Sequence, residues 1–512
     1  MWGWRSSRTV VVFAAATAFV GACVLPPLFM LSAIAVSSAP LAILRSALLD
    51  NRQQSLLYTT IGIGSGTAAV ATAIGVGLGF VLARIALPFK PALRIALIAP
   101  AALPPYVIAL AWTHIAGSVA FTAIGAIVVL AVAFSPLSML ATEVGLRRID
   151  PRLEEAALLV TTPARVLRRV TWPLLLPIVT SAALIIFVLA ISEFSVPGLL
   201  RVRVFTTEVF TAFASLYDFG QAAALSLPLL AVSVIVAGCA AIGVGDRLVT
   251  SRRPVRGALA DAFDGWRWGG AVAVGIGIVT MLGVPLAALV GEAFRATSIV
   301  PIVRNSRDAM INSLSLALLG ATAVTTLAAV IGYARARVNS TSGAVLDAFW
   351  IALFTVPSTV VGIGLIRMWN RPGALGAVYG TSAMLLLAYL ARFVPVGALG
   401  VAAFVRSVPD SHEEAAAVAG AGWLRTMTRI VLPQIRIGLL AVWVIAFILA
   451  FGEVGTSILV APAGESTLPI RVYTLTANAP PGQVAALALF QAIVVIGPLA
   501  LLGACLAPRR TR

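Results

Sequence analysis

The segment EEAAAVAGAGWLRTMTRIVLP, residues 413–433, is a charged stretch with helical character in a chain that is otherwise rich in apolar residues. A related segment, EEAALLVTTPARVLRRVTWP, occupies residues 154–173. Each copy starts with two acidic residues, has basic residues towards its end and closes with proline. Two copies of one polar segment indicate an internal repeat. The sequence that flanks each copy therefore decides the fold.

The composition places both segments in a membrane protein. Of the 512 residues, 60% are hydrophobic and only 11% are charged, and the mean hydropathy is +1.03. Apolar runs of about 20 residues recur along the chain, which is the length a helix needs to cross the hydrocarbon layer. The net charge of +17 does not indicate nucleic-acid binding, because the basic residues are scattered between apolar runs. We therefore predict an all-α, multi-pass membrane protein.

The apolar runs predict twelve membrane-spanning helices. Their expected ranges are 10–34, 57–82, 95–117, 120–141, 176–198, 222–245, 268–291, 311–334, 346–367, 377–402, 436–459 and 483–506. With a cytoplasmic N-terminus, 25 of the 36 Lys and Arg residues fall on the cytoplasmic side, ten fall outside, and Arg392 lies within a span. Cytoplasmic loops carry such an excess of basic residues. We expect both termini in the cytoplasm and an uncleaved first span.

A second set of matches shows how far the repeat extends. Residues 79–84, GFVLAR, match residues 332–337, GYARAR, with an offset of 253 positions. Further along, an offset of 260 aligns the two closing prolines, and it also aligns Glu193 of ISEF with Glu453 of FGEV. The sequence therefore predicts two homologous six-helix halves, residues 1–245 and 267–512. A polar, basic linker at residues 246–266 joins them.

Each polar segment is predicted to form a helix, a turn and a second helix on the cytoplasmic side. Asp410 and Glu413 have the spacing of a capping box, which predicts a helix from Ser411. In the first copy, Asp150 can cap a helix that begins with Pro151. Such an element is too polar to insert and has an apolar face, so it should dock onto something. The headgroup surface is one candidate, and a partner protein with two equivalent sockets is the other.

The second segment resembles the EAA loop of the permeases of binding-protein-dependent ABC importers. The matching positions are Glu414, Ala415, Ala416, Gly420, Ile430, Leu432 and Pro433. The corresponding residues of the first copy are Glu154, Glu155, Ala156, Val160, Val170, Trp172 and Pro173. The first copy thus keeps the leading Glu and the closing Pro but departs from the motif at four positions between them. The resemblance covers nearly the whole chain, since each half looks like one permease subunit.

The resemblance implies a type I ABC importer fold in a bacterial inner membrane and a coupling function. Each loop would insert into a cleft of a separate ATPase subunit, two copies in all, and an external substrate-binding protein would deliver the cargo. Glu154 and Glu414 would be the ionic contacts with the ATPases. The apolar residues expected to fill the second cleft are Trp423, Leu424, Met427 and Ile430. The overall layout is most similar to ferric iron importers, with thiamine and phosphonate importers as alternatives.

The chain itself shows no sign of an ATPase. A phosphate-binding P-loop needs a Gly-Lys-Ser or Gly-Lys-Thr sequence, and the single lysine, Lys90, follows Phe89. We therefore expect a transport subunit rather than an enzyme, with no cofactor and no metal site of its own. Charges within a membrane are costly and often functional, so Glu193, Glu453 and Arg392 are the candidates for a pathway or gate.

One rival function shares the predicted architecture. A proton-coupled secondary transporter can also have twelve helices in two related halves. It would be expected to carry a basic G-x-x-x-D-R-x-G-R-R-like loop after its second span, whereas this chain has ARIALPFKPALR there. An intramembrane enzyme would need Asp, His or Lys grouped at one membrane face, and the aspartates lie instead in loops and at helix ends.

Overall fold

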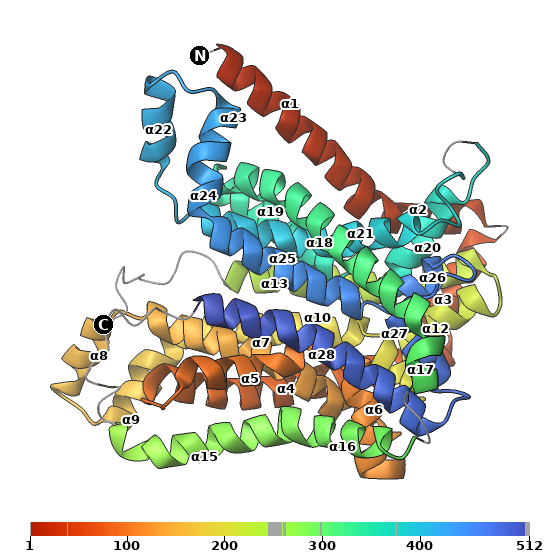
Figure 1. The fold of residues 1–512 in the computed structure, drawn as a ribbon, viewed down its shortest axis with the longest axis horizontal. Coiled ribbons are helices and arrows are strands. Elements are labelled where there is room, and N and C mark those ends of the chain that lie inside the picture. The colour runs from red at the N-terminus through yellow and green to blue at the C-terminus, as the bar shows by residue number, and fades with distance from the viewer. Residues whose placement is uncertain are drawn as a thin grey trace.

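The computed structural model describes residues 2–37, 39–243, 259, 263–296, 300–338, 340–373 and 376–506, and this part of the chain is helical without strands. The predicted linker at residues 246–266 falls largely outside the described residues. Figure 1 shows long helices running side by side across the molecule, with short helices at both ends of the bundle.

In its described residues, the first half contains six spans and five shorter α-helices. The spans are α1 (Trp2–Phe19) continued by α2 (Leu25–Val36), α4 (Asn51–Arg84), α5 (Lys90–Ala102) with α6 (Pro105–Ala116), α7 (Ala123–Arg148), α10 (Trp172–Ser192) and α13 (Phe219–Gly243). The shorter helices are α3 (Pro40–Leu49), α8 (Pro151–Leu158), α9 (Pro163–Val166), α11 (Ser195–Leu199) and α12 (Phe205–Ala214).

The second half repeats this order. Its spans are α15 (Arg267–Ile278) continued by α16 (Val284–Ala293), α18 (Arg307–Ala336), α19 (Ser340–Thr355) with α20 (Ser358–Trp369), α21 (Ala383–Val405), α25 (Arg436–Gly452) and α28 (Pro481–Leu506). The shorter helices are α17 (Val300–Asn305), α22 (Asp410–Val418), α23 (Trp423–Thr426), α24 (Leu432–Gln434), α26 (Ser457–Val460) and α27 (Leu468–Leu475).

The number of spans agrees with the prediction when bent helices are counted once. Among the described residues, nine helices are long and apolar enough to cross a membrane, and three further pairs pass the same test but are bent, which gives up to twelve spans. The α5–α6 and α19–α20 pairs are bent by 91° and 87°. Their breaks fall at Pro104 and Pro357, as expected because proline cannot continue the helical hydrogen bonding of the preceding turn.

The two halves exchange their first spans. The helices α1 and α2 of the first half contact α18 and α20 of the second half, and α15 and α16 of the second half contact α4, α5 and α6 of the first. In Figure 1, α1 accordingly lies along the upper edge of the bundle and α15 along the lower edge. The sequence repeat therefore does not correspond to two spatially separate domains.

Small residues let the second and fourth spans of each half approach closely. A Cβ atom added at Gly79 of α4 would lie 2.5 Å from the Met139 carbonyl oxygen of α7, and one at Gly332 of α18 would lie 2.7 Å from the Ala398 carbonyl oxygen of α21. Gly79 and Gly332 occupy the same position in the repeat. Glycine is required at both because any side chain would meet the neighbouring backbone.

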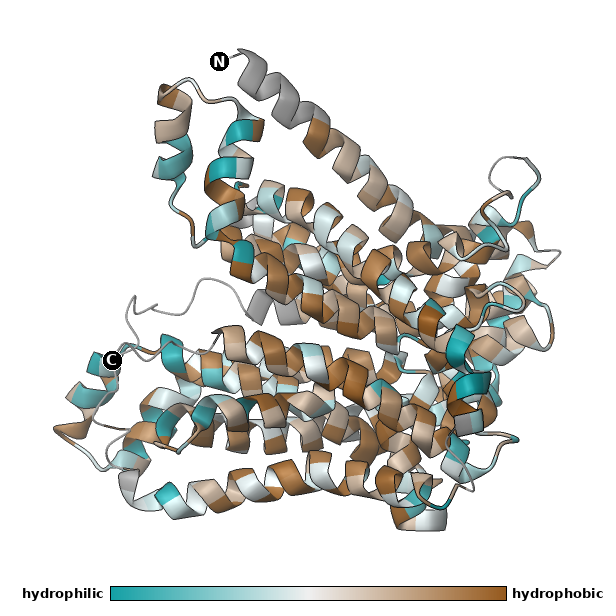
Figure 2. Ribbon diagram, in the orientation of Figure 1, coloured by the Kyte–Doolittle hydropathy of each residue, from teal (hydrophilic) through white to brown (hydrophobic). Residues whose placement is uncertain are grey.

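The outer surface of the bundle matches a membrane environment. Figure 2 shows apolar residues along the middle of the long helices and polar residues concentrated at both ends. Large apolar side chains such as Ile276, Ile311 and Leu319 are exposed on this surface. Helices satisfy their own backbone hydrogen bonds, so they can present such faces to lipid. The chain is a multi-pass membrane protein.

Candidate functional site

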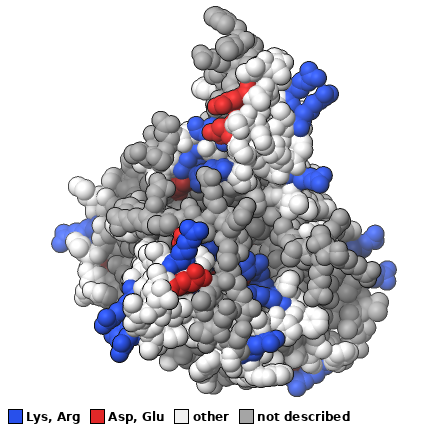
Figure 3. Space-filling view, turned by 90° about the vertical axis from the view of Figure 1, so that its left-hand side faces the viewer, with Lys and Arg blue, Asp and Glu red and all other residues white. Residues whose placement is uncertain are grey.

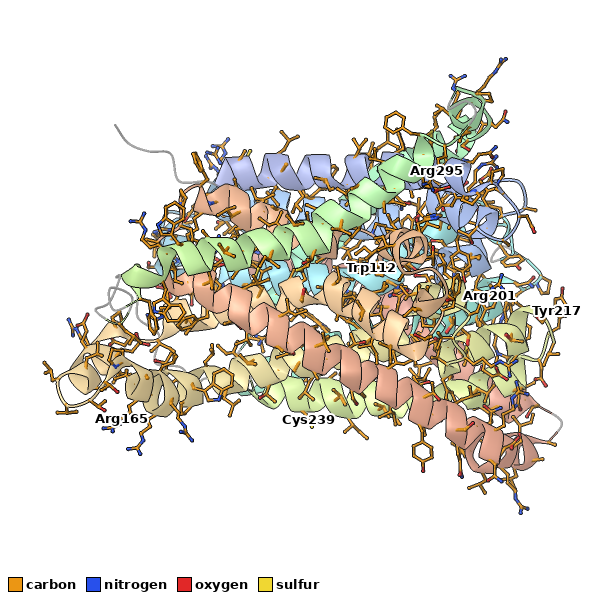
Figure 4. The ribbon with its side chains drawn as sticks, turned by 90° about the horizontal axis from the view of Figure 1, so that it is seen from below. Trp112, Arg165, Arg201, Tyr217, Cys239 and Arg295 are labelled. Carbon is orange, nitrogen blue, oxygen red and sulfur yellow. The ribbon has the colours of Figure 1, made fainter. Side chains whose placement is uncertain are left out.

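The two polar segments fold as helix–turn–helix loops at the same end of the bundle. The first loop consists of α8, a turn and α9, and the second consists of α22, a turn and α23. The second turn uses Gly420 in the left-handed region, with φ of 77°. Both loops lie on the left in Figure 1, where α1 also begins. Figure 4 marks this end by Arg165 and the opposite end by Arg201 and Arg295.

The two loops begin differently. Asp150 caps α8, as predicted, because its Oδ1 accepts a hydrogen bond of 3.0 Å from the Arg152 backbone amide and Pro151 is the first helical residue. In the second loop the predicted capping box is wrong. The helix α22 begins at Asp410, and its N-cap, Pro409, makes no side-chain hydrogen bond.

In the second loop a basic residue takes up the two carboxylates of the predicted capping box. Arg337, at the end of α18, pairs with both Asp410 and Glu413. A carboxylate held by a guanidinium is not free to cap the first backbone amides of its own helix. The start of α22 is therefore fixed by a contact with another helix rather than by local capping.

The first loop is attached to the bundle by a buried ion pair. Glu154 of α8 is 0% exposed. Its Oε1 lies 2.5 Å from Nη2 of Arg84, the last residue of α4. The Thr171 hydroxyl donates a 2.7 Å hydrogen bond to the same oxygen. A buried charge needs such partners, because removing it from water is otherwise costly.

The second loop contains the equivalent pair with different supporting groups. Glu413 accepts hydrogen bonds from Nε and Nη2 of Arg337 at its Oε1, the first of them 3.1 Å long. The Tyr333 hydroxyl donates a 2.7 Å hydrogen bond to Oε2. The Arg337 guanidinium also lies 5.9 Å from the centre of the Tyr333 ring. Arg84 and Arg337 are matched in the repeat, so both loops are joined to the second span of their half.

These pairs separate the buried acidic residue of each loop from the exposed one. The closing prolines align Glu154 with Glu414. In the structure the residue in the position of Glu154 is Glu413, whereas Glu155 and Glu414 are both exposed. The second loop has one more residue between its buried carboxylate and its closing proline. The exposed acidic residues are therefore Glu155 in one loop and Glu414 in the other.

The apolar residues of the loops divide into two groups. Trp423 and Met427 are buried in the chain itself, and the Trp423 ring centre lies 6.1 Å from that of Tyr333. Other members of the proposed coupling surface are exposed, among them Ala156, Val160, Pro173, Ala415, Gly420, Leu424 and Pro433, whereas Ala416 is buried and Ile430 is partly exposed. The sequence reasoning missed Leu159 and Val418, which are 87% and 90% exposed at the ends of the first helices.

The candidate pathway residues lie far from the loops, where the two halves meet. Glu193 and Glu453 directly follow α10 and α25. Oε1 of Glu453 lies 2.9 Å from Nη1 of Arg392 in α21. Glu193 accepts a 2.8 Å hydrogen bond from the Ser195 backbone amide, and it is close enough to both other charges to interact with them electrostatically. The structure thus brings all three predicted residues together.

Contacts between the halves surround this group of charges. The Ser192 hydroxyl donates a 2.9 Å hydrogen bond to the Thr355 carbonyl oxygen of the other half. The Tyr106 hydroxyl of α6 donates to Oε1 of Gln491 in α28. No local sequence pattern predicts these partners, because each pair joins positions far apart in the chain. Among the described residues, no group of His, Cys, Asp and Glu could hold a metal ion.

Comparison with known proteins supports this description of the chain. Residues 75–248 and 324–511 each match the family of binding-protein-dependent transport system inner membrane components. Each match includes one of the helix–turn–helix loops and the last spans of its half. The family model therefore matches more than half of the chain, once in each half of the repeat.

Curated relatives are similar over long stretches at low identity. A putative ferric transport system permease protein, FbpB 1 of Haemophilus influenzae, is 24% identical over 67% of this chain and 56% of its own length. The ferric transport system permease protein FbpB of Actinobacillus pleuropneumoniae is 24% identical over 65% and 51%. The chain thus spans about half the length of these two relatives. A second Haemophilus influenzae protein, the Fe(3+)-transport system permease protein FbpB 2, is 24% identical over 84% of both chains.

The repeated match, the membrane-spanning architecture and the paired loops agree with one another. The chain belongs to the family of binding-protein-dependent transport system inner membrane components.

Proposed function

We propose that the chain forms the translocation pathway of an ATP-driven import system and that its two loops contact separate ATPase subunits in the cytoplasm. The observation that carries this proposal is the pair of helix–turn–helix loops at one end of the bundle, each fixed to a second span by an Arg–Glu pair whose carboxylate is buried. Headgroup binding alone would not require two internally anchored loops in matching positions.

The exposed surface of the loops suits a protein partner. Glu155 and Glu414 are exposed beside Leu159 and Val418, so each loop offers an acidic group next to a large apolar one. A cleft with a basic residue and an apolar floor is complementary to this surface. We expect one ATPase subunit on each loop, and its movement on nucleotide binding would shift the bundle between two states.

The charge distribution sets the proposed orientation. Figure 3 views the end that carries the loops and shows many basic side chains over it. Cytoplasmic loops are the basic ones in membrane proteins, so we place this end, both termini included, in the cytoplasm of a bacterial cell. The opposite end then faces an external substrate-binding protein, and the charges of Glu193, Arg392 and Glu453 lie on the route between the halves.

We propose ferric iron as the cargo, because the relatives with long matches are ferric transport permeases by name. The test is uptake into proteoliposomes that contain this chain and its ATPase, with ATP inside and loaded binding protein outside. Labelled ferric iron should accumulate and labelled thiamine and phosphonate should not. Accumulation driven by a proton gradient without ATP would contradict the proposed function.

A further inference from the structure

The two loops receive their supporting hydroxyl from different places. In the second loop the donor to Glu413 is Tyr333, and the matching position of the first half is Phe80. In the first loop the donor to Glu154 is Thr171, and the matching position of the second half is Val431. The second half thus supplies this hydroxyl from a tyrosine, and the first half supplies it from a threonine at a different position of the repeat.

The position of the hydroxyl decides which elements its hydrogen bond connects. Tyr333 lies in the last turn of α18 and Arg337, four residues on, is the C-cap residue of the same helix, so the end of this span holds both oxygens of Glu413. Residues at this spacing face the same direction on a helix. The second loop is thereby tied to its span through two side chains. Trp423, which packs near Tyr333, adds a further contact between them.

The first loop has one such tie. Arg84 joins Glu154 to α4, whereas Thr171 ends the π-helical segment Leu167–Thr171 that runs from α9 into α10, so its hydrogen bond connects α8 with the start of the fifth span and not with α4. Within the described part of the chain, Oε2 of Glu154 and Nε of Arg84 have no hydrogen-bond partner. The Phe80 ring instead packs edge-on against Phe263, with ring centres 5.4 Å apart.

We infer that the second loop has the stiffer link to the second span of its half and that Tyr333 is a positioning residue for coupling. Movement imposed on α22 is carried to α18 by two bonded side chains, whereas movement imposed on α8 reaches α4 through Arg84 alone. The two ATPase contacts therefore act unequally on the bundle. This inference rests on the proposed coupling function for its consequence, but its structural part does not depend on any partner.

The structural part is tested by amide hydrogen exchange on the full chain in lipid nanodiscs. Local opening sets the exchange rate, so residues 410–418 should exchange more slowly than residues 151–158 in the native protein. Tyr333→Phe should speed exchange in residues 410–418 about tenfold, since a hydrogen bond to a buried charge is lost. The exposed Tyr58→Phe is the matched control and should change neither segment. Equal exchange in the two segments would overturn the inference.

Two double variants exchange the pattern of donors between the halves. Phe80→Tyr with Thr171→Val gives the first loop the donor of the second and should slow exchange in residues 151–158. Tyr333→Phe with Val431→Thr gives the second loop the donor of the first. Exchange in residues 410–418 of this variant should then be as fast as exchange in residues 151–158 of the native protein. The inference fails if neither double variant changes the amide exchange rates in this way.

The functional part is tested by uptake per ATP hydrolysed in proteoliposomes with the ATPase and the binding protein. Tyr333→Phe should lower this ratio several-fold more than Thr171→Val. Equal losses of uptake per ATP in the two variants would overturn the inference that the loops transmit movement unequally, even if their amide exchange rates differ. Native protein that transports nothing under these conditions would instead contradict the proposed function, and the exchange measurement would still stand.

Discussion

Nη2 of Arg84 lies 2.5 Å from Oε1 of Glu154, although the two residues belong to a membrane span and to a polar loop and are 70 positions apart. The matching pair of the second half, Arg337 and Glu413, makes the same connection. A helix that docks on a partner transmits force only if it is fixed to what must move. These two pairs supply that attachment.

Removing one member of a buried pair is expected to destabilise the protein strongly. Glu154→Ala leaves the Arg84 guanidinium buried without its counter-ion, which costs about 3–5 kcal/mol. The exposed neighbour provides the control, because Glu155→Ala should change stability by less than about 0.5 kcal/mol. Denaturant unfolding in detergent measures both. A similar loss in the two variants would contradict the assignment of Glu154 as the internal anchor.

The exposed acidic residues should show the opposite pattern. Glu155→Ala combined with Glu414→Ala is expected to leave folding and membrane insertion intact. Binding of this double variant to the ATPase should weaken by roughly tenfold, since two charged contacts of about 0.2–1 kcal/mol each are lost. Binding of the purified ATPase to the surface-immobilised permease chain measures this affinity. Unchanged binding and unchanged uptake would show that neither carboxylate is a contact.

Arg392 and Glu453 can be tested as pathway residues separately from their packing role. Arg392→Met leaves Glu453 buried and unpaired, so stability should fall by about 3–5 kcal/mol. Arg392→Met with Glu453→Leu removes both charges and should restore most of it, because well-packed apolar replacements of buried pairs are often neutral. We expect uptake to remain lost in the double variant. Full uptake there would mean that the pair serves packing alone.

The close approach of α4 and α7 gives a prediction with an internal control. Gly79→Ala places a methyl group 2.5 Å from the Met139 carbonyl oxygen, and such overpacking costs about 1–3 kcal/mol. Gly77 lies two residues away on the same helix with nothing within 4 Å of an added Cβ. Gly77→Ala should therefore be neutral or slightly stabilising, since alanine favours a helix. Thermal unfolding of both variants distinguishes these results.

Much of the architecture follows from local sequence properties. Apolar length predicts the spans, and the two sharp bends fall at Pro104 and Pro357, since each feature depends on residues that are neighbours in the chain. The exchange of first spans was not predicted. An apolar helix can pack against either half equally well by composition, and only the complementary surfaces of the folded bundle decide between them.

The candidate site was predicted in outline and differs by one residue in detail. Adjacent positions on a helix point about 100° apart, so Glu413 and Glu414 face in different directions. The motif alignment favours Glu414, but the contact with Arg337 decides which carboxylate is buried. Likewise, Glu453 and Arg392 were identified as buried charges, whereas their pairing depends on how α21 packs against α25.

Cross-linking tests the central claim most directly. Cys23, Cys239 and Cys505, the three native cysteines, are first replaced by serine, and Glu155→Cys, Glu414→Cys or Arg201→Cys is then introduced. A short thiol–amine cross-linker is added to the complex with the ATPase. The account predicts that positions 155 and 414 each capture one ATPase subunit and that position 201, at the opposite end, captures none. Capture at position 201, or none at either loop in complexes that still transport, would contradict it.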